Sequence, residues 1–121
     1  MAIDPVVQWR RIVNSWRERD WETAAALTAD DFRQTAVAGA VYNSMPRTFD
    51  KSAQNSLIRD WAERFDLSHE TKALAGLDDT IVTIFEERLN NGVSWTGYAI
   101  VRFNDEGQMV ELYSANPHLQ L

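Results

Sequence analysis

The sequence predicts a single α+β domain in which helices cover one face of an antiparallel sheet. Three observations predict this class. Helical patterns occupy the first half of the chain, long β-forming runs occupy the second half, and a length of 121 residues suits one domain with its own core. No internal repeat or low-complexity tract interrupts the pattern. We therefore expect residues 1–121 to form one domain.

Three helices are expected, each preceded by an aspartate that can accept hydrogen bonds from the first turn. Asp4 precedes Pro5, and apolar residues then recur at helical spacing: Val6, Trp9, Ile12, Val13 and Trp16. Asp20 can cap a short second helix that runs to Leu27. Asp50 can cap a third helix that ends near Asp66, and its apolar stripe comprises Leu57, Ile58, Trp61 and Phe65.

Five β-forming runs are expected to be strands: residues 32–38, 68–75, 80–89, 93–103 and 109–115. Residues 39–49 are expected to form a loop, because glycine, asparagine, serine and proline punctuate them. Asn90-Asn91-Gly92 suits a three-residue hairpin loop with Gly92 in the left-handed conformation, and residues 104–107 supply the next turn. The last four strands should therefore form an antiparallel meander.

Composition excludes several classes of function. The net charge of -6 is opposite to the basic surface that a nucleic-acid phosphate backbone requires, so no nucleic-acid partner is expected. The chain has no cysteine, which excludes disulfides, thiolate nucleophiles and cysteine-ligated metals. No apolar run approaches the roughly 20 residues that span a bilayer, and the N-terminus lacks a secretory pattern. We expect a cytoplasmic protein with no membrane segment and no metal.

Three short segments resemble the nuclear transport factor 2-like superfamily, and specifically its SnoaL-like and ketosteroid-isomerase-like members. They are residues 16–21 (WRERDW), 27–32 (LTADDF) and 100–107 (IVRFNDEG), which look like structural signatures of that family. The resemblance implies a cone-shaped curved antiparallel sheet wrapped around N-terminal helices, a cystatin-like α+β barrel. It also implies a cavity for a small hydrophobic molecule, chemistry without a cofactor, and a homodimer.

Strand alternation predicts which side chains line that cavity. A three-residue loop at residues 90–92 pairs Glu87 with Trp95 and Phe85 with Gly97, and places one mostly apolar set on the inner face. The opposite face carries Val82, Ile84, Tyr98 and Ile100, which we expect to pair two subunits.

Extending this alternation through the resemblance places Phe32, Gln34, Leu112 and Ser114 inward on the first and last strands. The tryptophans of the helices are expected to pack in the core, and some of them to reach the ligand. The complete set of predicted ligand contacts is Trp9, Trp16, Phe32, Gln34, Trp61, Phe65, Thr83, Phe85, Trp95, Ala99, Leu112 and Ser114.

The chemistries of the resembling enzymes do not carry over residue by residue. By the resemblance, the base and the oxyanion hole of ketosteroid isomerases fall at Ala36, Ile12 and Ala99, none of which transfers a proton. The polar groups of limonene-epoxide-hydrolase-like enzymes fall at Gln34, Ala36, Phe85, Glu87 and Ser114. Only Glu87 keeps a carboxylate there.

Glu87 is therefore the candidate acid or base, and two interpretations of it stay open. Between Phe85 and Trp95 a desolvated carboxylate could transfer protons near neutral pH. Near a hairpin end it could equally be solvated and inert. His118, in the C-terminal tail, is the second candidate, whereas His69 is expected to be a solvated surface histidine.

These observations leave three hypotheses. The first is a SnoaL-like enzyme that uses cofactor-free acid/base chemistry, by cyclisation, isomerisation or dehydration, on a small hydrophobic cyclic or polyketide-like molecule. The second is a non-catalytic binding or carrier domain for an apolar ligand. The third is a dimerising module whose pocket has collapsed.

Overall fold

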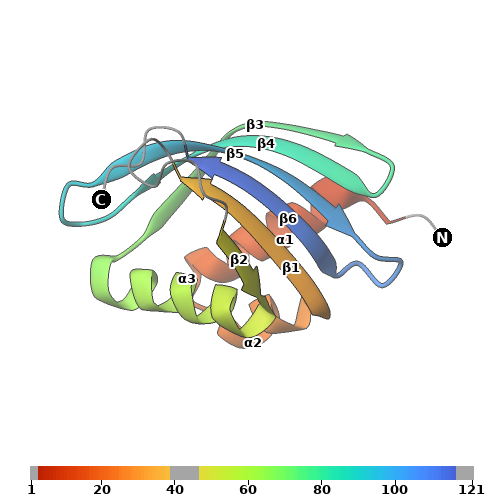
Figure 1. The fold of residues 1–121 in the computed structure, drawn as a ribbon, viewed down its shortest axis with the longest axis horizontal. Coiled ribbons are helices and arrows are strands. Elements are labelled where there is room, and N and C mark those ends of the chain that lie inside the picture. Colours follow the sequence, from red (N-terminus) through yellow and green to blue (C-terminus); the bar gives the residue numbers. More distant parts are fainter. Residues whose placement is uncertain (1–2, 39–46, 117–121) are drawn as a thin grey trace.

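The computed structural model describes residues 3–38 and 47–116, which form three helices and one six-stranded sheet (Figure 1). The helices are α1 (Pro5–Arg17), α2 (Trp21–Ala26) and α3 (Lys51–Phe65). The strands are β1 (Thr28–Ala38), β2 (Arg47–Asp50), β3 (Ser68–Leu77), β4 (Thr80–Arg88), β5 (Ser94–Phe103) and β6 (Met109–Asn116). The predicted α+β class is confirmed. His118 and residues 39–46 of the predicted loop lie outside the described residues.

Each helix begins where an aspartate side chain accepts backbone N–H groups of the first turn. Asp4 accepts from two residues of α1, Asp20 from Thr23 in α2, and Asp50 from Ala53 in α3. Four backbone N–H groups at a helix start have no partner within the helix, so these caps determine the three boundaries locally. Asp66 ends α3 in the left-handed conformation, at φ 47°.

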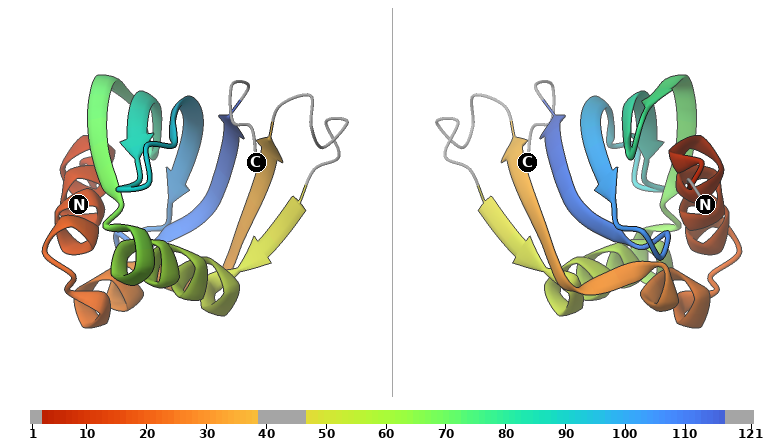
Figure 2. Two further views of the ribbon diagram at one scale, coloured as in Figure 1. Left: turned by 90° about the vertical axis from the view of Figure 1, so that its left-hand side faces the viewer. Right: turned by 90° about the vertical axis from the view of Figure 1, so that its right-hand side faces the viewer.

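The sheet has the strand order β2-β1-β6-β5-β4-β3 and curves strongly around the helices without closing (Figure 2). The meander β3-β4-β5-β6 is antiparallel as predicted. The expectation of a wholly antiparallel sheet is wrong, because β1 pairs with β6 in parallel. No hairpin joins these two strands, so nothing local in the sequence reveals their relative direction.

Two predicted boundaries near β1 are also wrong. The strand begins at Thr28, before Phe32, and its first part pairs with Met109 across a register shift. Residues 47–49, expected within a loop, form with Asp50 the edge strand β2 against β1. β2 is only four residues long and mostly exposed, so it has no apolar alternation from which a strand could be predicted.

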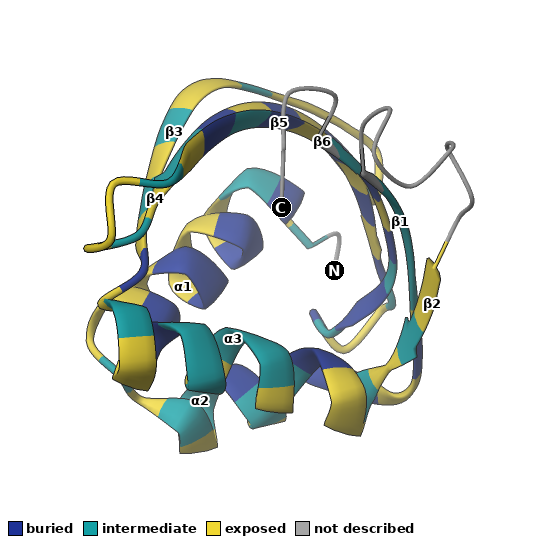
Figure 3. Cartoon of the chain, turned by 60° about the vertical axis from the view of Figure 1, so that its left-hand side comes forward, coloured by how far each residue is buried: buried dark blue, intermediate teal, exposed yellow. Residues whose placement is uncertain are grey.

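Helix α3 crosses the concave side of the sheet (Figures 2 and 3), but its buried face differs from the predicted stripe. The two buried residues are Gln54 and Ala62, and the predicted stripe residues Leu57, Ile58, Trp61 and Phe65 are only half-buried. The apolar spacing located the helix correctly, but the rotation of a helix about its axis depends on which parts of the sheet it packs against.

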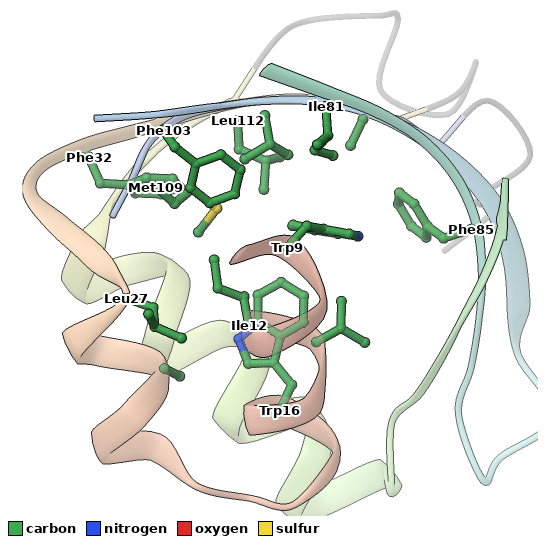
Figure 4. Packing of buried hydrophobic residues seen from close by; sticks show 14 residues of the cluster. Trp9, Ile12, Trp16, Leu27, Phe32, Ile81, Phe85, Phe103, Met109 and Leu112 are labelled. Atoms are coloured by element: carbon green, nitrogen blue, oxygen red, sulfur yellow. The ribbon is translucent and has the colours of Figure 1, made fainter. Parts of the chain in front are cut away.

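The core lies between α1 and the concave face of the sheet (Figure 4). Trp9 and Ile12 of α1 pack there with Phe32 of β1, Phe103 of β5 and Leu112 of β6. On the opposite, convex face the large apolar side chains are exposed: Val82, Ile84, Tyr98, Ile100 and Tyr113. The predicted inward and outward sets of β4 and β5 are thus confirmed. None of the helices in the described ranges has both the length and the apolar character needed to cross a lipid bilayer.

Candidate functional site

The hairpin between β4 and β5 places Glu87 on the concave face. Its register pairs Glu87 with Trp95 and Phe85 with Gly97, as predicted, and no bulge interrupts the ladder. The loop closes through a hydrogen bond from the Leu89 N–H to the Val93 carbonyl, with Gly92 at φ 90°. A glycine relieves the steric cost of this conformation, so the local sequence determines the register that turns Glu87 inward.

The Glu87 carboxylate is held by two partners from neighbouring strands. The indole N–H of Trp95 donates to Oε1 at 3.1 Å, and Nδ1 of His69 lies 3.2 Å from Oε2. The Glu87 side chain is only 15% exposed. The interpretation of Glu87 as a solvated hairpin residue is therefore wrong.

His69 is the main correction to the sequence analysis, since it is not a solvated surface residue. Its side chain is 7% exposed and stacks on Phe85, with ring centroids 4.9 Å apart. Trp9 and Trp16 of α1 meet the same imidazole edge-on at 6.0 and 6.1 Å. His69 reaches this position because β3 pairs it directly with Glu87.

The other ring nitrogen of His69, Nε2, is the atom relevant to chemistry. Nε2 is buried and finds no hydrogen-bond partner among the residues that the structure describes. Because Nδ1 faces a carboxylate oxygen, we assign the proton of the neutral imidazole to Nδ1, which leaves a lone pair on Nε2. Histidines that act as general bases commonly have this arrangement: a carboxylate orients one ring nitrogen, and the other ring nitrogen has no protein partner.

The structure brings part of the predicted contact set around this pair and leaves part elsewhere. Phe85, Trp95, Trp9 and Trp16 surround Glu87 and His69, and Trp61 meets Trp95 edge-on at 5.4 Å. The remaining buried members of the set are Phe32, Thr83, Ala99, Leu112 and Ser114, whereas Gln34, Trp61 and Phe65 are half-buried.

A second polar pair lies on the concave face between β1 and β6. The Gln34 side-chain amide donates to the Ser114 hydroxyl at 3.3 Å, which uses part of the hydrogen-bonding capacity of both predicted contacts. Thr83, in contrast, donates to the Ala73 carbonyl at 3.0 Å and serves the β3–β4 pairing. Thr83 is thus occupied within the sheet.

An open pocket of about 250 Å³ lies where α1, the end of α3 and the start of β3 meet. Its lining residues are Trp16, Arg17, Arg19, Asp66, Leu67, Ser68 and His69. Arg19 spans one wall, since its guanidinium donates to the carbonyls of Trp16 and Leu67 and pairs with Asp66. No local pattern in the sequence predicts this pocket, because its walls come from three elements that meet only in the folded chain.

Comparison with known proteins supports the fold rather than an activity. No family model matches this sequence, and no curated protein sequence matches it. A structure with a cystatin-like fold from Methylobium petroleophilum superposes with a TM-score of 0.81 at 13% identity, covering 100% of this chain and 82% of its own.

Two further structures share the fold at low identity. An NTF2-like protein of unknown function from Cytophaga hutchinsonii has a TM-score of 0.71 at 9% identity and covers 94% and 90% of the two chains. An LEH-like epoxide hydrolase from M. tuberculosis has a TM-score of 0.72 at 11% identity, and the match covers 93% of this chain and 81% of that one. The chain therefore has the fold of the nuclear transport factor 2-like superfamily.

Proposed function

We propose that the protein is a small cofactor-independent enzyme that moves a proton on a small hydrophobic molecule, with His69 as the base and Glu87 as its positioning residue. One observation carries the proposal. Glu87 uses both carboxylate oxygens to hold Trp95 and His69, and His69 is left with a buried Nε2 that no described residue occupies. A buried polar atom without a partner costs stability, so its retention favours a role in binding or chemistry.

The proposed step begins with neutral His69. Its Nε2 takes a proton from a carbon beside a carbonyl group of the substrate, and the electron pair of the broken C–H bond moves into an enolate. The Glu87 carboxylate stabilises the resulting imidazolium through Nδ1. Return of the proton to a different carbon is an isomerisation, and return to a departing hydroxyl is a dehydration that releases water. Attack of the enolate on an internal carbonyl, followed by return of the proton to the resulting alkoxide, is a cyclisation.

A hydrogen-exchange assay tests the proton transfer without knowledge of the natural substrate. A panel of aryl and cyclic ketones, including para-phenylacetophenone, is incubated with the protein in deuterium oxide, and loss of the hydrogens beside the carbonyl is followed by NMR. We expect exchange above the buffer rate, reduced by about 100-fold or more in His69→Asn. Asparagine keeps an N–H donor near Glu87 but has no titratable nitrogen.

A non-catalytic binding domain is the second candidate. The positions that correspond by resemblance to isomerase groups hold apolar side chains, and two of them, Ile12 and Ala99, are buried in the core. Binding of the ketones with no exchange above buffer for any member of the panel would reject the enzyme and favour this candidate.

We also propose that a second copy of this chain covers the convex face of the sheet. Val82, Ile84, Tyr98, Ile100 and Tyr113 are all exposed there, on adjacent strands. Two ion pairs flank them, Arg102 with Glu111 and Arg88 with Glu86, so these four charged side chains present no net charge to an identical face. The Glu111 hydrogen bond raises the pKa of the Arg102 guanidinium.

A further inference from the structure

Gln54 of α3 is a buried amide that makes no hydrogen bond with any residue that the structure describes. Its side chain is 1% exposed, and neither Nε2 nor Oε1 has a partner in the described part of the chain. Gln8 of α1 provides the contrast, since its buried amide donates to the Gly107 carbonyl at 2.7 Å and its oxygen accepts from Arg11. The buried amide of Gln8 is thus satisfied, whereas that of Gln54 has no partner among the described residues.

The position of Gln54 relates it to the proposed site. Gln54 and Ala62 share the buried face of α3, eight residues apart, which is roughly 12 Å along a helix. Ala62 packs in one cluster with Trp95, whose indole N–H binds Glu87. The buried side of α3, which crosses the concave side of the sheet (Figure 3), thus runs from Gln54 to Ala62, and Ala62 lies beside the tryptophan that binds Glu87.

We propose that Gln54 binds the polar end of an elongated, largely apolar ligand, through a group that carries an adjacent hydrogen-bond donor and acceptor. A glutamine amide presents an N–H donor beside a carbonyl acceptor. A carboxamide or lactam has a carbonyl to accept from that N–H and an N–H to donate to that carbonyl. The inference rests on the proposed function in that the other end of the ligand lies beside His69.

Charge favours a neutral group at Gln54. No arginine or lysine side chain is buried within the described ranges, and the nearby Lys51 of α3 is paired with Asp30, so a ligand carboxylate at Gln54 would have to compete for a counter-charge after losing its hydration. The Glu87 carboxylate and the net charge of -6 disfavour an anion further. A carboxamide or lactam fits both conditions.

Three probes of one shape test the proposal by calorimetry. Para-phenylbenzamide carries donor and acceptor, para-phenylacetophenone carries the acceptor alone, and para-phenyltoluene carries neither. We expect the wild-type protein to bind the amide about tenfold or more tightly than the ketone, and Gln54→Met to bind the two equally. Equal affinities in the wild-type protein, an amide preference that survives in Gln54→Met, or no binding of the amide at its solubility limit would overturn the proposal.

The control variant is Gln8→Met, which breaks the bond to Gly107. It should lower the thermal midpoint and keep the amide preference, whereas Gln54→Met should not lower the midpoint, since no hydrogen bond is lost. If Gln54→Met does not fold, Gln54→Leu replaces it, and the wild-type protein supplies a further readout. On addition of para-phenylbenzamide the side-chain amide signal of Gln54 should shift in the ¹⁵N NMR spectrum, and an unchanged signal would contradict binding there.

The two proposals can fail separately. The calorimetric test measures binding alone, so an absence of hydrogen exchange leaves it intact. His69→Asn should lower exchange by about 100-fold or more and keep the preference for the amide over the ketone. Loss of the preference in that variant would show that the amide binds at His69 and not at Gln54.

Discussion

Glu87 lies directly opposite His69 across the β3–β4 pair, with Oε2 3.2 Å from Nδ1, and its second oxygen is occupied by the Trp95 indole. Both carboxylate oxygens are thus engaged, so Glu87 has no free oxygen to offer a ligand without releasing a partner. The proton-transferring role that the sequence suggests for Glu87 passes, in our proposal, to His69. Glu87 then acts by orienting the imidazole and by stabilising its charged form.

Glu87→Gln should show that Glu87 acts on the orientation and charge of His69 and not on the binding of the ketone. The amide oxygen can still accept from Trp95, but a neutral side chain cannot stabilise a His69 imidazolium. We expect the hydrogen-exchange rate at saturating ketone to fall at least about tenfold, with little change in the ketone concentration that gives half the maximal rate. Glu86→Gln, on the convex face beside Arg88, is the matched control and should exchange at the wild-type rate. An unaltered rate in Glu87→Gln would remove Glu87 from the mechanism.

Asp20 should make the stability of α2 depend on pH. The hydroxyl of Thr23 and then its backbone N–H, both donating to the carboxylate, lower the pKa of Asp20 from its ordinary value of 3.8. A lowered pKa stabilises the folded protein above the unfolded value, and this contribution disappears as the pH falls through the folded value.

The test compares thermal midpoints of the wild type and Asp20→Ala at pH 7 and at pH 3. The variant should melt at a lower temperature at pH 7, and the difference should shrink at pH 3. If the difference in thermal midpoint is the same at both pH values, ionisation of Asp20 adds no stability beyond that of an uncharged cap.

Arg19 should stabilise the corner between α1 and α2 despite its unfavourable backbone conformation. Its φ of 60° lies in the left-handed region, which disfavours a side chain, but its guanidinium donates to Trp16, Leu67 and Asp66. Arg19→Ala keeps the unfavourable φ and loses the bonds, so we expect a loss on the order of 1–2 kcal/mol in urea unfolding. Arg19→Gly should be less destabilising than alanine, because glycine adopts this φ freely. Equal losses would indicate that the backbone relaxes.

Ile100→Lys should disrupt the proposed homodimer. Ile100 is 48% exposed on the convex face, where the flanking carboxylates of Glu111 and Glu86 are already paired with arginines, so a buried ammonium group would have to compete for a counter-charge. Sedimentation velocity should show a dimer for the wild type and a monomer for the variant at the same concentration. Val7→Lys, at a 49% exposed residue on α1 away from the sheet, is the control and should stay dimeric. A monomeric wild-type protein at high micromolar concentration would reject this interface.

The sequence alone determined the features that short-range interactions decide. Asp4, Asp20 and Asp50 begin the helices because each cap bonds to residues two or three positions away. Gly92 and its loop align β4 with β5, and alternation then turns Glu87 inward and Ile100 outward. These interactions need no partner from elsewhere in the fold.

The contents of the site depend on contacts between segments far apart in the chain. The β3–β4 ladder shifts by one residue between Thr71 and Ala73, and without that bulge the pairing of Leu77 with Thr80 would place His69 opposite Arg88. The parallel pairing of β1 with β6 and the rotation of α3 that buries Gln54 likewise depend on segments far apart in the chain. A bulge and a helix rotation are settled by packing over the whole core, and no local pattern of residue types records them.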